Sequence, residues 1–155
     1  MPTRLAFLLL TFLFSCDFDP GEQDEGRLDY IAYNPKVASI PAVRGYPQME
    51  IPSDNPMTID GIELGRRLFF DPILSRDSSL SCAGCHKPEL SFADGLATSK
   101  GIDGLNGKRS AMSLLDIGFQ QNGLFWDGRS RTLEEQALLP VEDVLEMHFT
   151  WPEAI

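Results

Sequence analysis

The feature that most constrains this chain is Cys82-Ala83-Gly84-Cys85-His86, which has the Cys-x-x-Cys-His pattern of covalent c-type haem attachment. Two thiols at this spacing can each form a thioether with one vinyl group of haem. The histidine after the second thiol can then ligate the iron from one face. With histidine on one face, the groups on the other face decide between oxygen binding, peroxide chemistry and electron transfer. The motif therefore predicts a haem protein whose reaction is set by its distal residues.

Two other uses of the paired cysteines, a redox dithiol and half of a zinc site, fit less well. A redox pair is expected at a strand-to-helix junction in a βαβ unit, and no such pattern surrounds Cys82 and Cys85. A structural zinc site needs four ligands, and the chain's only further Cys or His residues are Cys16 and His148. Cys16 has another predicted role, so haem attachment is the preferred interpretation.

The first fifteen residues have the pattern of a lipoprotein signal peptide. Arg4 precedes a largely apolar run, Leu5 to Phe14, whose length suits a signal peptide and is too short to span a bilayer. Leu13-Phe14-Ser15-Cys16 resembles a bacterial lipobox, in which the cysteine is lipidated and becomes the mature N-terminus. A plain cleaved signal would instead leave Cys16 as a free thiol. We expect a periplasmic protein held to a bacterial membrane by lipid at Cys16, a compartment in which haem is attached to such motifs.

Length and charge limit the remaining interpretations. The 155 residues are enough for one domain, and the formal net charge of −10 disfavours nucleic acid as a partner. An acidic surface could steer a basic electron-donor protein, although solubility is the simpler reason for such a charge.

The pattern along the chain predicts a mostly α domain with long loops, preceded by a tether. Residues 16–54 contain an acidic stretch and then regularly spaced prolines, which predict an extended segment along the domain surface. Residues 55–155 are expected to form a cytochrome c-like haem domain. Its glycine-rich loop, Gly101 to Gly107, lacks the strand and helix that flank a phosphate-binding loop. We therefore expect this loop to lie over the haem edge.

Helix start and stop signals place several helices in this domain. Thr58 or Asp60 can cap a helix that ends before Asp71-Pro72, and the haem motif is expected to open a short helix after Ser81. Thr132-Leu133-Glu134-Glu135 is a capping box, and we expect Pro140 to close the helix that follows it.

A further helix-start pattern, Thr150-Trp151-Pro152-Glu153, lies one turn before the last residue. Because one turn is unstable by itself, we expect that a longer natural protein continues beyond Ile155.

From about Ile51 to Ile155 the sequence resembles the N-terminal half of the bacterial diheme cytochrome c peroxidases and related diheme oxidation enzymes. The resemblance depends on five blocks in matching order and spacing. They are Glu63-Leu64-Gly65-Arg66-Arg67-Leu68-Phe69-Phe70-Asp71-Pro72, Ser81-Cys82-Ala83-Gly84-Cys85-His86, Phe125-Trp126-Asp127-Gly128-Arg129, Leu133-Glu134-Glu135-Gln136-Ala137 and Val144-Leu145-Glu146-Met147.

This resemblance implies a role for each residue around the iron. His86 would be the proximal ligand, Glu146 the distal acid–base residue and Gln136 its neighbour in the pocket. Trp126 would carry electrons between two haems. Without the resemblance, Glu146 would be an ordinary surface carboxylate and Trp126 a core aromatic.

Four charged residues near these blocks have simpler expected roles. Asp127 and Arg129 are expected to be structural partners in one turn. Arg66 and Arg67 could meet haem propionates, although exposed helix charges explain them equally well.

The sequence departs from the family pattern at three points. The glycine-rich loop has Asp103 where well-studied relatives have a histidine that ligates the oxidised haem, so we expect an open site. Ser110 replaces an asparagine that helps to hold calcium, which puts a calcium site in doubt. The chain contains no second Cys-x-x-Cys-His motif. It would therefore carry one covalent haem c, with a second expected in the full-length protein.

The function implied is haem-dependent reduction of hydrogen peroxide to water, with electrons from a small protein such as a cytochrome c or a copper protein. A related activity is the oxidation of another substrate, and the resemblance leaves room for a homodimer of the full-length form. The competing hypotheses are a single-haem electron carrier and an inactive fragment. A carrier needs a sixth ligand, for which Met112, Met147 and His148 are the candidates.

Overall fold

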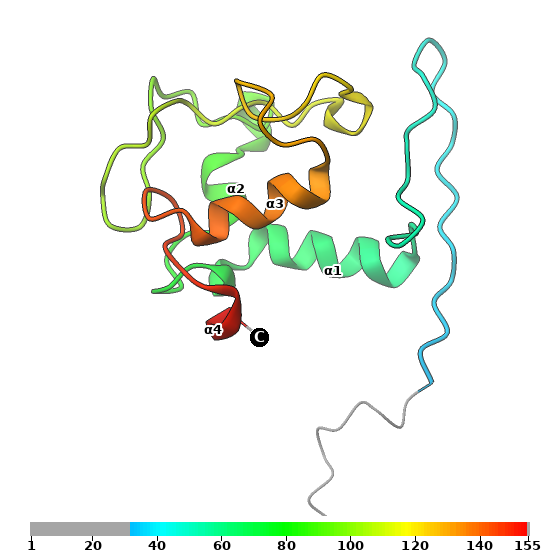
Figure 1. Ribbon diagram of the computed structural model, residues 1–155, viewed down its shortest axis with the longest axis horizontal. Coiled ribbons are helices and arrows are strands. Elements are labelled where there is room, and N and C mark those ends of the chain that lie inside the picture. The colour runs from blue at the N-terminus through cyan, green and yellow to red at the C-terminus, as the bar shows by residue number, and fades with distance from the viewer. Residues whose placement is uncertain (1–31, 155) are drawn as a thin grey trace, which may run out of the picture. The chain divides into compact units, whose positions relative to one another are not determined.

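The computed structural model describes residues 32–154 (Figure 1). The chain divides into two units, residues 1–34 and 35–155, and the second holds most of the described residues. The predicted signal peptide and Cys16 lie outside the described residues. None of the helices between residues 32 and 154 is long and apolar enough to cross a membrane.

The second unit is mostly helical with long loops, as the sequence predicts. Its α-helices are α1 (Ile59–Phe70), α2 (Cys82–Cys85), α3 (Leu133–Glu142) and α4 (Trp151–Ala154), and its 3₁₀ turns are Pro72–Leu74, Pro88–Leu90 and Ile117–Phe119. Among residues 32–154, strand pairing is limited to isolated bridges. In Figure 1, α3 lies above α1 in the view, and long loops connect the helices.

Local side-chain chemistry sets both ends of α1. The Thr58 Oγ1 atom accepts a hydrogen bond from the Gly61 N–H at 3.0 Å, so Thr58 is the cap and Asp60 lies in the first turn. At the other end, Asp71 has an extended backbone and its Oδ1 atom accepts from the Ile73 N–H at 3.0 Å. The predicted helix and its stop before Pro72 are confirmed.

The capping signal of α3 is confirmed, but its predicted end at Pro140 is wrong. Thr132 Oγ1 accepts from the Glu135 N–H at 3.2 Å, and the helix then continues through Pro140 to Glu142. A proline this close to a helix end removes only one N–H from the last turn. The Asp143 N–H still donates to the Leu139 carbonyl at 3.1 Å, which completes that turn.

The proline-containing segment before α1 has little regular secondary structure, and most of its described residues are exposed (Figure 1). It is tied to the start of α1 where the Ala38 N–H donates to the Met57 carbonyl at 2.9 Å. Farther along, the Tyr46 hydroxyl donates to the Asp116 carboxylate at 2.8 Å, and its ring packs 4.8 Å from that of Phe119. These contacts fix the proline-containing segment against the 3₁₀ turn at 117–119.

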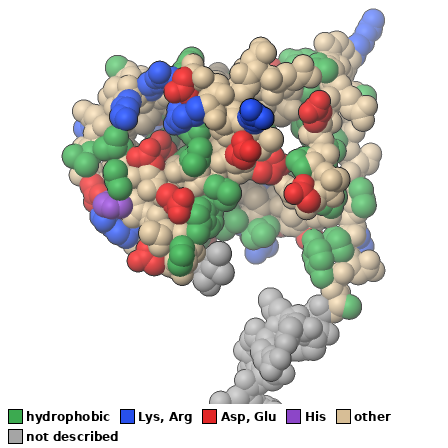
Figure 2. Space-filling model, viewed as in Figure 1, with side chains coloured by type: hydrophobic (Ala, Val, Ile, Leu, Met, Phe, Trp, Pro, Cys, Tyr) green, Lys and Arg blue, Asp and Glu red, His purple; other side chains and the backbone are tan. Residues whose placement is uncertain are grey.

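The interior of this unit contains a large cavity and few buried hydrophobic side chains. Within the described residues, the buried hydrophobic side chains are Leu124, Val141 and Met147. A cavity of about 920 Å³ lies among residues of α1, α2, α3 and α4 and of the loops between them. On the face in Figure 2, acidic and basic side chains are interspersed around the apolar ones. Helices and loops therefore surround a mainly apolar space.

Candidate functional site

The two cysteines of the haem motif lie at the ends of the single turn of α2, and both line the cavity. They do not form a disulfide with each other, and burial raises the pKa of each thiol. Gly84, between them, lets Leu80 pack against the turn, since a β-carbon at this position would lie 2.7 Å from the Leu80 Cδ1 atom. The predicted short helix after Ser81 is confirmed, and it presents both sulfur atoms to one space.

His86 caps the C-terminal end of α2 and also lines the cavity. Its Nδ1 atom lies 2.9 Å from the carbonyl oxygen of Phe92. Because a carbonyl can only accept a hydrogen bond, Nδ1 is the donor, and Nε2 is not engaged in this contact. Metal-binding histidines use this arrangement, in which the second nitrogen is held by a backbone acceptor.

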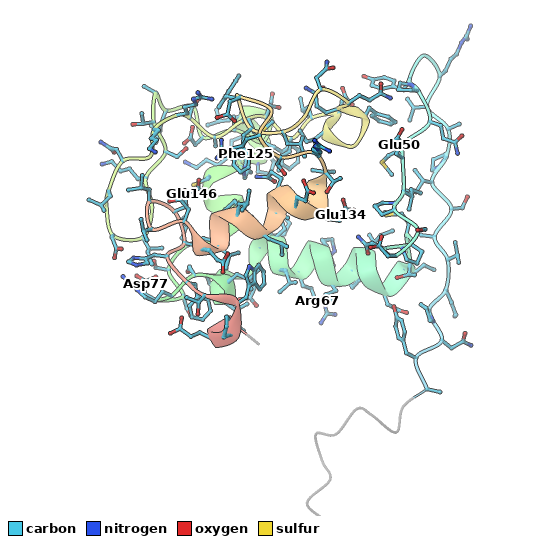
Figure 3. The ribbon with its side chains drawn as sticks, in the orientation of Figure 1. Glu50, Arg67, Asp77, Phe125, Glu134 and Glu146 are labelled. Carbon is cyan, nitrogen blue, oxygen red and sulfur yellow. The ribbon has the colours of Figure 1, made fainter. Side chains whose placement is uncertain are left out.

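Gln136 and Glu146 line the same cavity, Gln136 from α3 and Glu146 from the loop that follows it. Figure 3 shows Glu146 on this loop. Burial raises the pKa of the Glu146 carboxyl, and the charge of Asp143 adds to this effect, whereas the Arg129 guanidinium opposes it. The structure thus brings a half-buried carboxyl and an amide to the cavity that holds the haem motif.

Trp126 lies at the edge of the cavity, and its side chain points largely to solvent. It is 61% exposed, and its Nε1 atom donates to the Ser110 carbonyl at 2.8 Å. The alternative prediction of a core aromatic is therefore wrong. Nearby, the expected pairing of Arg129 with Asp127 is confirmed at 2.9 Å, and the Arg129 guanidinium stacks 3.4 Å from the Phe125 ring centroid.

Arg66 and Arg67 lie on the exposed face of α1 and not in the cavity wall. Both guanidiniums bind Glu63, at 2.9 Å and 3.0 Å, and they lower the pKa of this carboxyl to about 2. The structure supports exposed helix charges over propionate contacts.

The three candidate sixth ligands are placed differently. Met112 and Met147 line the cavity, and Met147 is only 5% exposed. His148 is outside the lining, with its Nδ1 atom 2.5 Å from an Asp103 carboxylate oxygen. Of the glycine-rich loop, Gly107 lines the cavity, next to the flanking Lys100 and Lys108, whereas Asp103 is outside the lining and binds His148.

Sequence reasoning missed Trp151, which also lines the cavity. Its buried Nε1 atom has no hydrogen-bond partner within residues 32–154. A buried N–H without an acceptor is unfavourable, and a cofactor carboxylate would satisfy it. The helix-start pattern at 150–153 could not predict that Trp151 lines the cavity, because this pattern indicates only local backbone structure.

These residues fit a c-type haem. The cavity is large and mainly apolar, two thiols and a histidine with an oriented ring face it, and an unpartnered donor is available for a polar group. Within residues 32–154, no cluster of three or more His, Cys, Asp or Glu side chains could hold a separate metal ion.

Comparison with known proteins agrees with this chemistry. The family model described as di-haem cytochrome c peroxidase matches residues 60–155. The chain belongs to the di-haem cytochrome c peroxidase family. This membership implies haem c as the cofactor, and it confirms the family and the cytochrome c-like fold that the sequence predicts.

Individual members of the family show how much of the chain is shared. The methylamine utilization protein MauG of Methylophilus methylotrophus is 39% identical over 98 residues, which are 63% of this chain and 29% of MauG. The cytochrome c peroxidase Ccp of Escherichia coli is 37% identical over 130 residues, 83% of this chain and 27% of Ccp.

Among solved structures, a MauG-like protein associated with microbial copper homeostasis superposes with a TM-score of 0.69 at 34% identity. The match covers 76% of this chain and 34% of that protein. The chain thus spans under a third of the length of MauG and Ccp.

Proposed function

We propose that this domain reduces hydrogen peroxide to water at a c-type haem attached to Cys82 and Cys85 and ligated by His86. The observation that carries the proposal is the half-buried Glu146 carboxyl in the same cavity as the haem motif. When bound, the haem supplies a redox-active iron, at which two electrons and two protons convert peroxide into two water molecules.

The proximal side of the site orients a single histidine nitrogen. The Phe92 carbonyl accepts the Nδ1 proton of His86, which fixes the ring and reserves Nε2 for the iron. The Phe92 backbone is itself held by a hydrogen bond from its N–H to the Lys87 carbonyl at 2.8 Å. The turn that follows the haem motif therefore has a positioning role.

On the distal side, Glu146 would act as base and then as acid. Its carboxylate takes the proton from one peroxide oxygen and returns it to the departing oxygen, so that water leaves in place of hydroxide. Gln136 would hold peroxide or water through its amide, which does not compete for the proton. Both side chains line the cavity, as this sequence of transfers requires.

We further propose that a small redox protein, such as a cytochrome c or a copper protein, supplies the electrons. Trp126 is suited to pass them on because its indole ring reaches both the cavity and solvent.

A single-haem electron carrier is the second candidate, favoured by the presence of Met112 and Met147 in the cavity wall. Absorption and electron paramagnetic resonance spectra of the oxidised haem-loaded protein distinguish the two. The peroxidase proposal expects a high-spin iron that binds cyanide readily, whereas a low-spin spectrum with methionine ligation would support the carrier.

The first prediction is that each chain carries one covalent haem. The pyridine haemochrome of the denatured protein should give one haem per chain that acidified organic solvent does not extract. The Cys82→Ala plus Cys85→Ala double variant should lose covalent haem, because both thioethers are removed. Haem that remains attached in the double variant would contradict the assignment.

The second prediction concerns the proposed lipid anchor at Cys16. Cys16→Ala should move the protein from the membrane fraction to the soluble periplasmic fraction, because the acyl chains are attached to this sulfur. Fractionation followed by immunoblotting measures the change, with Ser15→Ala as the matched control, since a small residue is kept before the cysteine. Unchanged membrane association of Cys16→Ala would argue against the anchor.

A further inference from the structure

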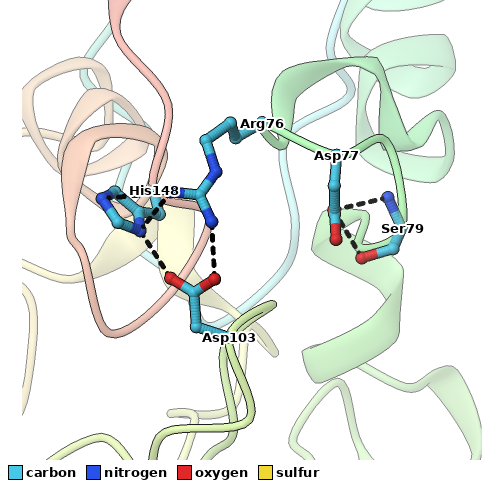
Figure 4. A network of polar contacts seen from close by, with 5 residues as sticks. All are labelled: Arg76, Asp77, Ser79, Asp103 and His148. Carbon is cyan, nitrogen blue, oxygen red and sulfur yellow. Dashed lines mark hydrogen bonds and ion pairs between the residues drawn. The ribbon is translucent and has the colours of Figure 1, made fainter.

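Three charged or polar side chains that no part of the peroxide chemistry uses contact one another (Figure 4), and none of them lines the cavity. Asp103 is at the centre: its Oδ1 atom accepts from the Arg76 Nη2 atom, and its Oδ2 atom lies by the His148 Nδ1 atom, both at 2.5 Å. The Arg76 Nη1 atom lies 2.9 Å from the same histidine nitrogen. A carboxylate is the stronger partner for an N–H, so Nδ1 donates to Asp103; the Arg76 guanidinium, which has only donors, then makes no hydrogen bond to this nitrogen.

The three residues come from three segments that are distant in sequence. Arg76 follows the 3₁₀ turn at 72–74, Asp103 lies in the glycine-rich loop, and His148 comes two residues after Glu146. Asp103 lies 27 residues from Arg76 and 45 from His148 along the chain. The cluster therefore joins three parts of the fold through one carboxylate.

Two of these segments also hold the backbone around Glu146. The Ile102 N–H donates to the Glu146 carbonyl at 3.0 Å, and the Arg76 N–H donates to the Met147 carbonyl at 3.1 Å. One donor, Ile102, is the neighbour of Asp103 in the chain, and the other donor is Arg76, whose side chain binds Asp103. Asp103 thus connects the two supports of the segment that carries Glu146.

The backbone after Glu146 also needs support. His148 has a φ of 47°, in the left-handed region that non-glycine residues seldom adopt. Such a conformation persists where surrounding contacts hold it. The His148 N–H donates to the Asp143 carbonyl at 3.0 Å, and its ring is held by Asp103.

We propose that Asp103 is a positioning residue, which locks the glycine-rich loop to Arg76 and His148 and thereby fixes the direction in which Glu146 faces the cavity. The proposal rests on the proposed role of Glu146. The contacts of Asp103 with Arg76 and His148 can still be tested by hydrogen exchange, which does not depend on that role. The three side chains are 46%, 32% and 37% exposed, for Arg76, Asp103 and His148 respectively. Because partly exposed pairs are screened by water, we expect a local effect on the loop without loss of the fold.

The test compares Asp103→Asn with Asp77→Asn in the haem-loaded protein. Asp77→Asn is the matched control because it makes the same chemical change at the residue next to Arg76. Among residues 32–154, the Asp77 carboxylate accepts hydrogen bonds only from the Ser79 N–H and hydroxyl, at 3.0 Å and 2.6 Å (Figure 4). Asp103→Asn should raise amide hydrogen exchange in residues 101–105 and 145–148 by about two- to fivefold, the range expected for an exposed ion pair.

The same variant should slow the reaction with peroxide by about two- to tenfold, because a catalytic group that is slightly misplaced loses rate. Carbon monoxide binding to the reduced haem should not change, because it needs no proton transfer. Asp103→Glu keeps the charge and should restore part of the rate, and Asp77→Asn should match the parent protein. Arg76→Gln removes the other partner of the Arg76–Asp103 ion pair, so it should raise hydrogen exchange in the same two segments.

The outcomes separate the effect of Asp103 on loop stability from its effect on the peroxide reaction. Faster exchange with a slower peroxide reaction supports the proposal in full. Unchanged exchange in both Asp103→Asn and Arg76→Gln, or equal changes in Asp77→Asn, overturns it. Faster exchange with an unchanged peroxide rate overturns the positioning role of Asp103. If Glu146→Gln also left that rate unchanged, the proposed function itself would fail.

Discussion

Replacing Glu146 with glutamine is expected to slow the reaction with hydrogen peroxide by about 10²- to 10⁴-fold, the usual contribution of a general acid–base group. Glutamine has nearly the same shape and can still form hydrogen bonds, but it cannot take up and return a proton. Covalent haem content and carbon monoxide binding to the reduced protein should stay unchanged. Stopped-flow absorbance after mixing with peroxide measures the rate directly.

Glu142→Gln provides the matched control for this experiment. Glu142 is exposed at the end of α3 and does not line the cavity, so the same chemical change there should leave the peroxide rate close to that of the parent protein. A normal rate in Glu146→Gln, or an equal loss in Glu142→Gln, would contradict the assignment of the base to Glu146.

The pH dependence of the same reaction provides a separate test. The base is active as the carboxylate, so the rate should fall as the pH drops through the pKa of Glu146. Burial raises that pKa above the usual value of 4.5, and the acid limb should therefore lie at a higher pH than for an ordinary glutamate. Asp143→Asn removes a nearby negative charge that raises the pKa of Glu146, so it should move the limb to lower pH. A limb that does not move in this variant would point to another titrating group.

The parts of this site that the sequence predicts are those encoded by neighbouring residues. Cys82, Cys85 and His86 lie within one turn, and helix caps such as Thr58 depend on residues three positions apart. Pro140 shows the limit even of local signals, because a proline in the last turn removes one backbone bond and does not end the helix. Glu146 has no local signature, and only the family resemblance singled it out.

Contacts between distant residues could not be predicted from one sequence. Arg76, Asp103 and His148 follow no periodic pattern, and their pairing depends on how three loops meet. The unpartnered Nε1 atom of Trp151 is a property of the folded cavity, which a composition or a motif cannot report. The exposed position of Trp126 likewise follows from the placement of its loop at the cavity edge.

Gly101→Ala should have the second large effect, because the glycine-rich loop passes unusually close to the segment that carries Glu146. A β-carbon at position 101 would lie 2.2 Å from the Leu145 carbonyl oxygen and 2.6 Å from the Glu146 carbonyl oxygen. Both obstacles are backbone atoms, so the two segments must move apart. Forcing extra atoms into such a contact typically lowers the free energy of unfolding by about 1–3 kcal/mol.

The same movement should displace Glu146, and a shift of about 1 Å at a catalytic group can reduce a rate by about 10²-fold. We therefore expect Gly101→Ala to lower the free energy of unfolding in denaturant titrations. It should also slow the peroxide reaction by up to about 10²-fold. Gly107→Ala is the control in the same loop, since its β-carbon would lie 3.5 Å from the Ser99 carbonyl oxygen, an ordinary contact, and its unfolding midpoint should match that of the parent chain. A Gly101→Ala protein with normal stability and a normal rate would show that Glu146 does not depend on close approach of the loop.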